Sequence, residues 1–142
     1  MENSEVQVNK IICVEGIDGS GKSTLVRQLE DFDIFANDRS FITDVAYRIE
    51  DGNKPWCNVT MLEMSFVLNH CIVIYCKNDN SFENSIKRGE TNVVTKERSD
   101  RLSKIYDGVM RFIELFTEAT VITYDWQRDN IDDLVNKIKE VI

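Results

Sequence analysis

The sequence has 142 residues, of which 42% are hydrophobic and 30% are charged, a size and composition typical of one globular domain. A formal charge of −8 argues against broad binding to a nucleic-acid backbone and leaves room only for a local basic patch. No apolar run reaches the roughly 20 residues of a membrane-spanning helix, and the acidic start, Met1–Glu5, lacks the features of a signal peptide. We therefore expect one domain over residues 1–142, without a membrane partner and located in the cytoplasm.

The first quarter of the chain predicts a strand, a helix and a second strand. Ile11–Val14 is a short continuous apolar run, which favours a central strand buried on both faces. After a glycine-rich turn, the apolar spacing predicts a helix over Lys22–Glu30. Phe32–Ala36 predicts a short second strand that ends at Asn37-Asp38-Arg39.

The middle of the chain continues this alternation. Apolar residues three and four positions apart predict a helix over Ile42–Ile49, and a further helix is expected at about Thr60–Leu68. Cys71–Cys76 is the clearest strand, because six apolar or aromatic residues follow one another. Ser81–Arg88 predicts a short helix that Gly89 ends.

The last third predicts a loop, a long helix, a strand and a closing helix. Gly89–Lys96 has no helical pattern, Leu102–Phe116 has the pattern of an amphipathic helix, Thr120–Tyr124 that of a strand, and Ile131–Ile142 that of a helix. Strands that alternate with helices predict an α/β fold of three layers, with about four parallel strands joined by right-handed crossovers. Such sheets bind ligands outside the carboxyl ends of their strands.

A phosphate-binding motif joins the first strand to the first helix. Gly16–Ser23 fits G-x-x-x-x-G-K-[ST] at every position. Its glycines let successive N–H groups face phosphate oxygens, and the following helix adds its positive end. In this motif Lys22 reaches the β- and γ-phosphates of ATP, and Ser23 offers its hydroxyl to Mg²⁺. The residues expected to bind the nucleotide are Gly16, Asp18, Gly19, Ser20, Gly21, Lys22, Ser23 and Thr24.

The segment Val14–Leu25 resembles the opening of thymidylate kinases. More broadly, it is similar to the nucleotide and deoxynucleoside kinase group of P-loop proteins. Its order Gly-x-Asp-Gly-x-Gly-Lys-Ser-Thr points away from GTPase switches and toward kinases of small acceptors. The resemblance implies a P-loop NTPase fold, ATP and Mg²⁺ as cofactors, and transfer of the γ-phosphoryl group to a nucleoside or nucleotide.

The element Asn37-Asp38-Arg39-Ser40 resembles the Asp-Arg element of the same kinases. In that family the acidic residue supports Mg²⁺ or the acceptor hydroxyl, and the arginine holds the acceptor. A carboxylate at the end of a strand can bind metal or take a proton from a hydroxyl, and an arginine offers two parallel donors to a phosphate. Asp38 is therefore a metal and catalytic candidate beside Ser23, and Arg39 a catalytic candidate. The alternative is that Asp38 caps the helix and pairs with Arg39 on the surface.

Phosphoryl transfer also requires positive charge around the moving group. Arg98, Arg101 and Lys104 step by three and share one helical face. The kinases that this sequence resembles carry an arginine-bearing lid in this region, so we expect a flexible lid at about residues 89–101 with Arg98 and Arg101 as catalytic candidates. Arg88 is expected near the adenine or in solvent. The alternative for these charges is a solvated helix face.

The resemblance ends on the acceptor side. Relatives place a longer segment before the Asp-Arg element, whereas here Glu30 and Asp38 are eight positions apart. Three functions stay open: a kinase of a free nucleoside or nucleotide, alone or as a homodimer; a kinase of a 5-hydroxymethylpyrimidine within DNA, as in phage 5-hydroxymethyluracil-DNA kinases; and a nucleotide-binding switch without catalysis. We expect the first, because the chain is acidic and keeps both the Asp-Arg element and the lid arginines.

Overall fold

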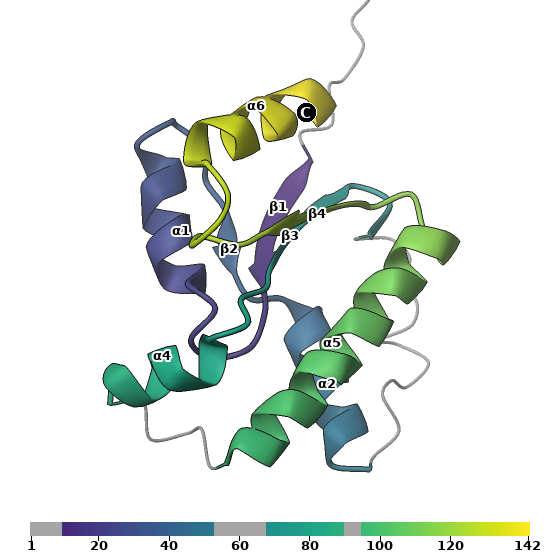
Figure 1. Ribbon diagram of the computed structural model, residues 1–142. Coiled ribbons are helices and arrows are strands. Elements are labelled where there is room, and N and C mark those ends of the chain that lie inside the picture. Colours follow the sequence, from purple (N-terminus) through teal and green to yellow (C-terminus); the bar gives the residue numbers. More distant parts are fainter. Residues whose placement is uncertain (1–9, 53–67, 90–94) are drawn as a thin grey trace, which may run out of the picture.

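The computed structural model describes residues 10–52, 68–89 and 95–142. At its centre lies a parallel sheet of four strands in the order β2-β1-β3-β4 (Figure 1). Strand β1 pairs in parallel with β2 on one side and with β3 on the other, so the predicted α/β fold and the interior place of the first strand are confirmed. The strands are β1 (Ile11–Glu15), β2 (Asn37–Asp38), β3 (Cys71–Cys76) and β4 (Thr120–Tyr124).

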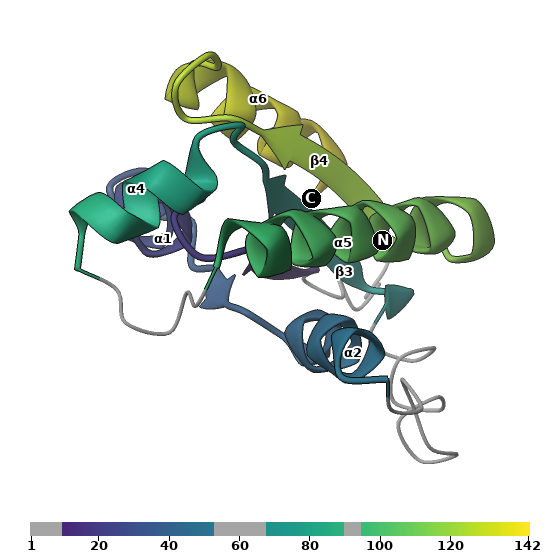
Figure 2. The ribbon, with the colours of Figure 1, turned by 60° about the horizontal axis from the view of Figure 1, so that its bottom comes forward.

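Helices cover both faces of this sheet and make the three layers that the sequence predicts (Figure 2). Helices α1 (Lys22–Glu30) and α6 (Ile131–Val141) bury their apolar sides against one face. Helices α2 (Phe41–Glu50) and α5 (Lys96–Phe116) pack on the other face. The short helix α4 (Ser81–Lys87) lies beyond the carboxyl end of β3, near the start of α1 (Figure 1).

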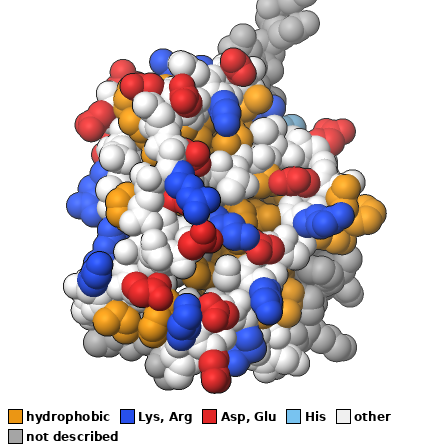
Figure 3. Space-filling model, in the orientation of Figure 1, with side chains coloured by type: hydrophobic (Ala, Val, Ile, Leu, Met, Phe, Trp, Pro, Cys, Tyr) orange, Lys and Arg blue, Asp and Glu red, His pale blue; other side chains and the backbone are white. Residues whose placement is uncertain are grey.

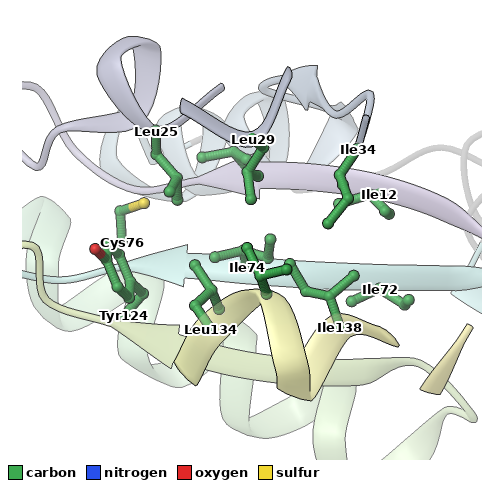
Figure 4. Packing of buried hydrophobic residues seen from close by; sticks show 12 residues of the cluster. Ile12, Leu25, Leu29, Ile34, Ile72, Ile74, Cys76, Tyr124, Leu134 and Ile138 are labelled. Atoms are coloured by element: carbon green, nitrogen blue, oxygen red, sulfur yellow. The ribbon is translucent and has the colours of Figure 1, made fainter. Parts of the chain in front are cut away.

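Strand β3 shows why the layers form. All six of its residues are buried, and successive side chains point to opposite faces of the sheet. Ile72 and Ile74 pack between side chains of α1 and α6 (Figure 4), whereas Val73 and Tyr75 pack with α2 and α5. Full burial of one such aliphatic side chain contributes roughly 1.5–3 kcal/mol, so a strand buried on both sides holds both helix layers.

The second strand differs from its prediction. The sequence predicts a strand over Phe32–Ala36, but only Asn37 and Asp38 pair with β1. The chain first closes the end of α1 with a turn, in which the N–H groups of Phe32 and Ile34 both donate to the carbonyl of Leu29 and Asp33 adopts a left-handed φ of 58°. Because of this turn, the backbone reaches the edge of β1 only at Asn37.

Two other expectations fall partly outside the described residues. Of the helix expected at Thr60–Leu68, residues 60–67 lie outside them, and so do residues 90–94 of the expected lid. The described part of that lid from Lys96 onward is the first turns of α5. In the described part of the chain, no helix has the length and apolar character needed to cross a membrane.

Candidate functional site

The phosphate loop, Gly16–Ser23, curls between the end of β1 and the start of α1 at the carboxyl edge of the sheet (Figure 1). Two of its glycines have left-handed backbones, with φ of 81° at Gly19 and 89° at Gly21. A Cβ at Gly19 would overlap the backbone of Ser81, and one at Gly21 would lie 2.8 Å from Cδ1 of Trp126. Helix α4 and the chain after β4 therefore pack closely against the loop, and only glycine fits at these two positions.

Lys22 is a buried cation inside this loop. It is only 7% exposed, and its Nζ donates to the carbonyl oxygen of Ile17 at 2.8 Å. Burial is the main cause that lowers the pKa of Lys22 to about 8; the nearby charge of Arg39 contributes to this shift, whereas Asp18 opposes it. Because an anion placed beside Lys22 would favour its charged form, the loop is suited to receive negative charge.

A pocket of about 80 Å³ opens beside the phosphate loop. Within it, the Oγ of Ser23 donates to Oδ2 of Asp38 at 3.0 Å, and Nη2 of Arg39 donates to Oδ1 of Asp18 at 2.8 Å. The phosphate loop and the Asp-Arg element, which are separate in the sequence, thus meet at one edge of the sheet. The pocket is lined by Asp18, Gly19, Gly21, Lys22, Ser23, Asp38, Arg39 and Arg88.

The pair formed by Ser23 and Asp38 fits Mg²⁺. Both residues offer hard oxygen ligands, and Mg²⁺ commonly binds one or two protein oxygens while water and substrate phosphates complete its shell. Among the residues that the structure describes, no group of three or more His, Cys, Asp or Glu could hold a metal ion. The arrangement therefore suits a metal that arrives with a phosphate ligand better than one held by protein side chains alone.

The turn that follows β2 aims Arg39 at the phosphate loop. Its backbone is left-handed, with a φ of 73°, and its N–H donates to the carbonyl of Val14 at 2.9 Å. For a residue with a side chain this conformation costs roughly 1 kcal/mol, and such strain gathers at binding sites. The cap of α2 is Ser40, whose Oγ accepts from the N–H of Ile42 at 3.2 Å. Asp38 is therefore not the cap of this helix.

The arginines of α5 lie elsewhere. Nε of Arg98 donates to Oε1 of Glu50 at 2.8 Å, and Nη2 of Arg101 donates to the same oxygen at 3.3 Å. The hydrogen bond from Arg98 lowers the pKa of Glu50, whose side chain is only 7% exposed. Arg98 also lies over the ring of Tyr47, 5.9 Å from its centre. These contacts join α5 to the end of α2, and neither arginine lines the pocket of the phosphate loop.

The remaining nucleotide-site candidates serve the loop itself. The Oγ of Ser20 donates to the carbonyl of Ile17 at 2.6 Å and closes the loop internally. Thr24 accepts from Nη2 of Arg88 at 3.4 Å. Neither they nor Gly16 line the pocket, although all three belong to the segment that shapes it.

Two residues of the site were not assigned from sequence. Arg88, expected near the adenine or in solvent, lines the pocket at the end of α4. Glu15 ends β1 directly before the loop, is fully buried and accepts from the hydroxyls of Ser40 and Thr43. Burial raises the pKa of Glu15, and these hydrogen bonds oppose the shift. A charged residue at the end of an apolar strand was the available signal for Glu15.

Comparison with known proteins gives the fold. No protein-family model matches the sequence, and no curated protein matches it significantly. The solved YorR protein from Bacillus subtilis, in complex with phosphorylated GDP, is 16% identical with a TM-score of 0.66, over 92% of this chain and 94% of that one. Deoxyadenosine kinase from M. mycoides with bound dCTP is 15% identical with a TM-score of 0.57, over 91% and 98%.

A second structure of that deoxyadenosine kinase, with the products dCMP and dCDP, is 14% identical with a TM-score of 0.56, over 92% of this chain and 99% of that one. At these identities the similarity concerns the path of the backbone. The chain therefore has an α/β fold of the P-loop NTPase type, in which the described residues form a four-stranded parallel sheet, and its backbone follows a path similar to that of a solved deoxyadenosine kinase.

Proposed function

We propose that this protein is an ATP-dependent kinase that transfers the γ-phosphoryl group to a nucleoside or nucleotide. The observation that carries this proposal is the meeting of Lys22, Ser23, Asp38 and Arg39 in one polar pocket at the carboxyl edge of the sheet. Phosphoryl transfer needs positioning and charge stabilisation more than covalent chemistry, and these four side chains offer both. A fold shared with deoxyadenosine kinase supports the same reaction class.

On the donor side, the curled loop presents its N–H groups to the phosphates, and Lys22 exchanges its bond to the Ile17 carbonyl for phosphate oxygens. Ser23 and Asp38 are the residues that would hold Mg²⁺ through their oxygens. When bound, Mg²⁺ neutralises charge on the phosphates. Arg88, which follows the last residue of α4, adds a further positive charge to the lining of the pocket.

On the acceptor side, Asp38 orients the attacking hydroxyl or takes its proton, and Arg39 holds the acceptor. Arg39 suits this role because its guanidinium already lies between the phosphate loop and the start of α2. The role expected for Arg98 and Arg101 requires that Glu50 release them, because Glu50 is the last residue of α2 and does not line this pocket.

The surface supports a small free acceptor. On the face shown in Figure 3, positive and negative side chains alternate instead of forming a continuous basic area. Because DNA binding draws its affinity from several phosphate contacts, this mixture favours a single nucleoside or nucleotide. Two observations favour an acceptor that contains deoxyribose. The sequence of the phosphate loop resembles that of thymidylate kinases, and the similar deoxyadenosine kinase was solved with deoxycytidine nucleotides bound.

Labelled ATP tests this proposal. The protein is incubated with Mg²⁺, ATP labelled at the γ-phosphate, and a panel of deoxynucleosides, deoxynucleoside monophosphates and duplex DNA with or without 5-hydroxymethyluracil. We expect label on one class of free acceptor, little change between low and high salt, and a strongly reduced rate of labelling with Lys22→Ala. If only DNA were labelled, and the labelling fell steeply at high salt, the acceptor would be a base within DNA and not a free nucleoside or nucleotide. Bound ATP with no labelled product would indicate a nucleotide-binding switch.

A further inference from the structure

A buried polar cluster joins the end of β1 to the start of α2 and contacts Arg39. Glu15 is 0% exposed, and each of its two carboxylate oxygens accepts from a different hydroxyl of the α2 start. Oε2 accepts from Ser40, and Oε1 accepts from Oγ1 of Thr43 at 2.6 Å. Burying a carboxylate costs free energy unless it is well hydrogen-bonded, and an apolar residue at this position would avoid that cost. The presence of Glu15 here therefore calls for an explanation other than stability.

Thr43 uses the whole hydrogen-bonding capacity of its hydroxyl. A hydroxyl has one proton to donate and two lone pairs to accept with. Thr43 donates to Glu15, and it accepts from Nη1 of Arg39 at 3.2 Å and from the hydroxyl of Tyr106 at 3.1 Å. Because the hydroxyl proton of Thr43 is used in the hydrogen bond to Glu15, both lone pairs of its oxygen are available to accept from Arg39 and Tyr106.

We propose that Glu15 and Thr43 are positioning residues for Arg39. Glu15 orients the hydroxyl of Thr43, and that hydroxyl holds Nη1 of Arg39 while Asp18 of the phosphate loop holds Nη2. The guanidinium is thus fixed at two nitrogens, toward the side of the pocket where the acceptor binds. This inference rests on the proposed function, since fixing Arg39 matters for transfer only if Arg39 holds the acceptor.

Substitutions at Thr43 separate this role from simple packing. Thr43→Val keeps the shape of the side chain and removes the hydroxyl, so Arg39 loses one of its two anchors. Thr43→Ser keeps the hydroxyl and should retain most of the activity. Thr117→Val is the matched control, because its hydroxyl bonds to the carbonyl of Ile113 at the end of α5, away from the pocket.

Kinetics with the acceptor found by the panel give the first readout. We expect Thr43→Val to lower kcat/KM for the acceptor by about 10- to 100-fold with an unchanged KM for ATP, because small displacements of a positioning group are costly in transfer. In an Arg39→Ala background, Thr43→Val should have no further effect, because the contact is already lost. Thr117→Val should match the wild type. An additional loss in the Arg39→Ala background, or wild-type kinetics in Thr43→Val, would overturn the proposal.

Side-chain NMR of ¹⁵N-arginine protein gives a readout that needs no activity. With Arg39 assigned by Arg39→Lys, we expect slow rotation of its guanidinium, seen as separate Nη signals at low temperature, in the wild type and in Thr117→Val. Averaged signals are expected in Thr43→Val. Identical Arg39 signals in wild type and Thr43→Val would overturn the positioning role. If no acceptor is ever phosphorylated, the proposed function fails, and these spectra still decide whether Thr43 fixes Arg39.

Discussion

Arg39 and Arg98 both lie at the start of a helix and both pair with a carboxylate, but the two carboxylates belong to different parts of the molecule. The partner of Arg39 is Asp18 of the phosphate loop, which lines the pocket. The partner of Arg98 is Glu50 at the end of α2, which does not. The spacing of Arg98 and Arg101 in the sequence shows that they share one face of a helix. Which carboxylate that face contacts depends on how the helices and strands are arranged in the fold.

The largest effect is expected on the phosphate-loop side of this comparison. Lys22→Ala removes the charge that follows the γ-phosphate, and the loss of such a contact costs about 3–4 kcal/mol, or 10²–10³ in kcat. The variant should stay folded, because the charged lysine is buried at a cost in the free protein. Single-turnover transfer and a thermal melt measure both properties, with Lys139→Ala on the exposed side of α6 as the control. Equal turnover of Lys22→Ala and Lys139→Ala would contradict the assignment.

The second effect separates the two groups of arginines directly. Arg88→Ala should lower kcat by about 10-fold or more, because Arg88 lines the pocket where charge moves during transfer. Arg98→Ala should change kcat by less than about threefold, because Glu50 neutralises Arg98 outside the pocket. Steady-state kinetics of both variants give the comparison. An equally large loss in Arg98→Ala would show that Glu50 releases α5 during transfer and that the expected lid is real.

The pH dependence of nucleotide binding tests the environment of Lys22. Its pKa is about 8 in the free protein, and a bound phosphate favours the charged form. As pH rises through 8, the free protein loses this proton while the complex keeps it, so affinity is full below pH 8 and falls above it. Titration calorimetry should show a decline of up to about tenfold per pH unit above 8, with proton uptake. Lys22→Arg, which keeps its charge, should give a flat profile in this range. A flat profile for the wild type would contradict the buried lysine.

The smallest effect concerns the turn that aims Arg39. Both Arg39→Ala and Arg39→Gly lose the guanidinium, but only glycine adopts a φ of 73° without strain. Arg39→Gly should therefore be more stable than Arg39→Ala by roughly 1 kcal/mol in urea unfolding. At Arg48, in the last turn of α2, the order should reverse, because glycine costs about 1 kcal/mol in a helix. If the alanine variant were the more stable one at both positions, the left-handed turn would be ruled out.

Local patterns predicted most of the fold. The continuous apolar run of β3 and the periodic apolar residues of α1 and α6 are local signals. The bounds predicted from them agree closely with those in the structure. Strand β2 was misplaced because two residues form a strand only where they meet the edge of β1, and a left-handed Asp33 delays that meeting. No periodicity within 32–36 carries that information.

The same distinction applies to the site. The phosphate loop was readable because its glycines, Lys22 and Ser23 act within one short segment. Glu15 was not, because its role depends on hydroxyls of Ser40 and Thr43, 25 and 28 positions away. Arg88 was left open because its place depends on how α4 packs against the loop.

A crystal structure with Mg²⁺ and a non-hydrolysable ATP analogue tests the central claim most directly. The account predicts a triphosphate in the phosphate loop, with Nζ of Lys22 moved from the Ile17 carbonyl to phosphate oxygens and the metal between Ser23 and Asp38. It further predicts that Arg39 stays on Asp18 and Thr43. A triphosphate bound outside this pocket, with Lys22 still on Ile17, would contradict it.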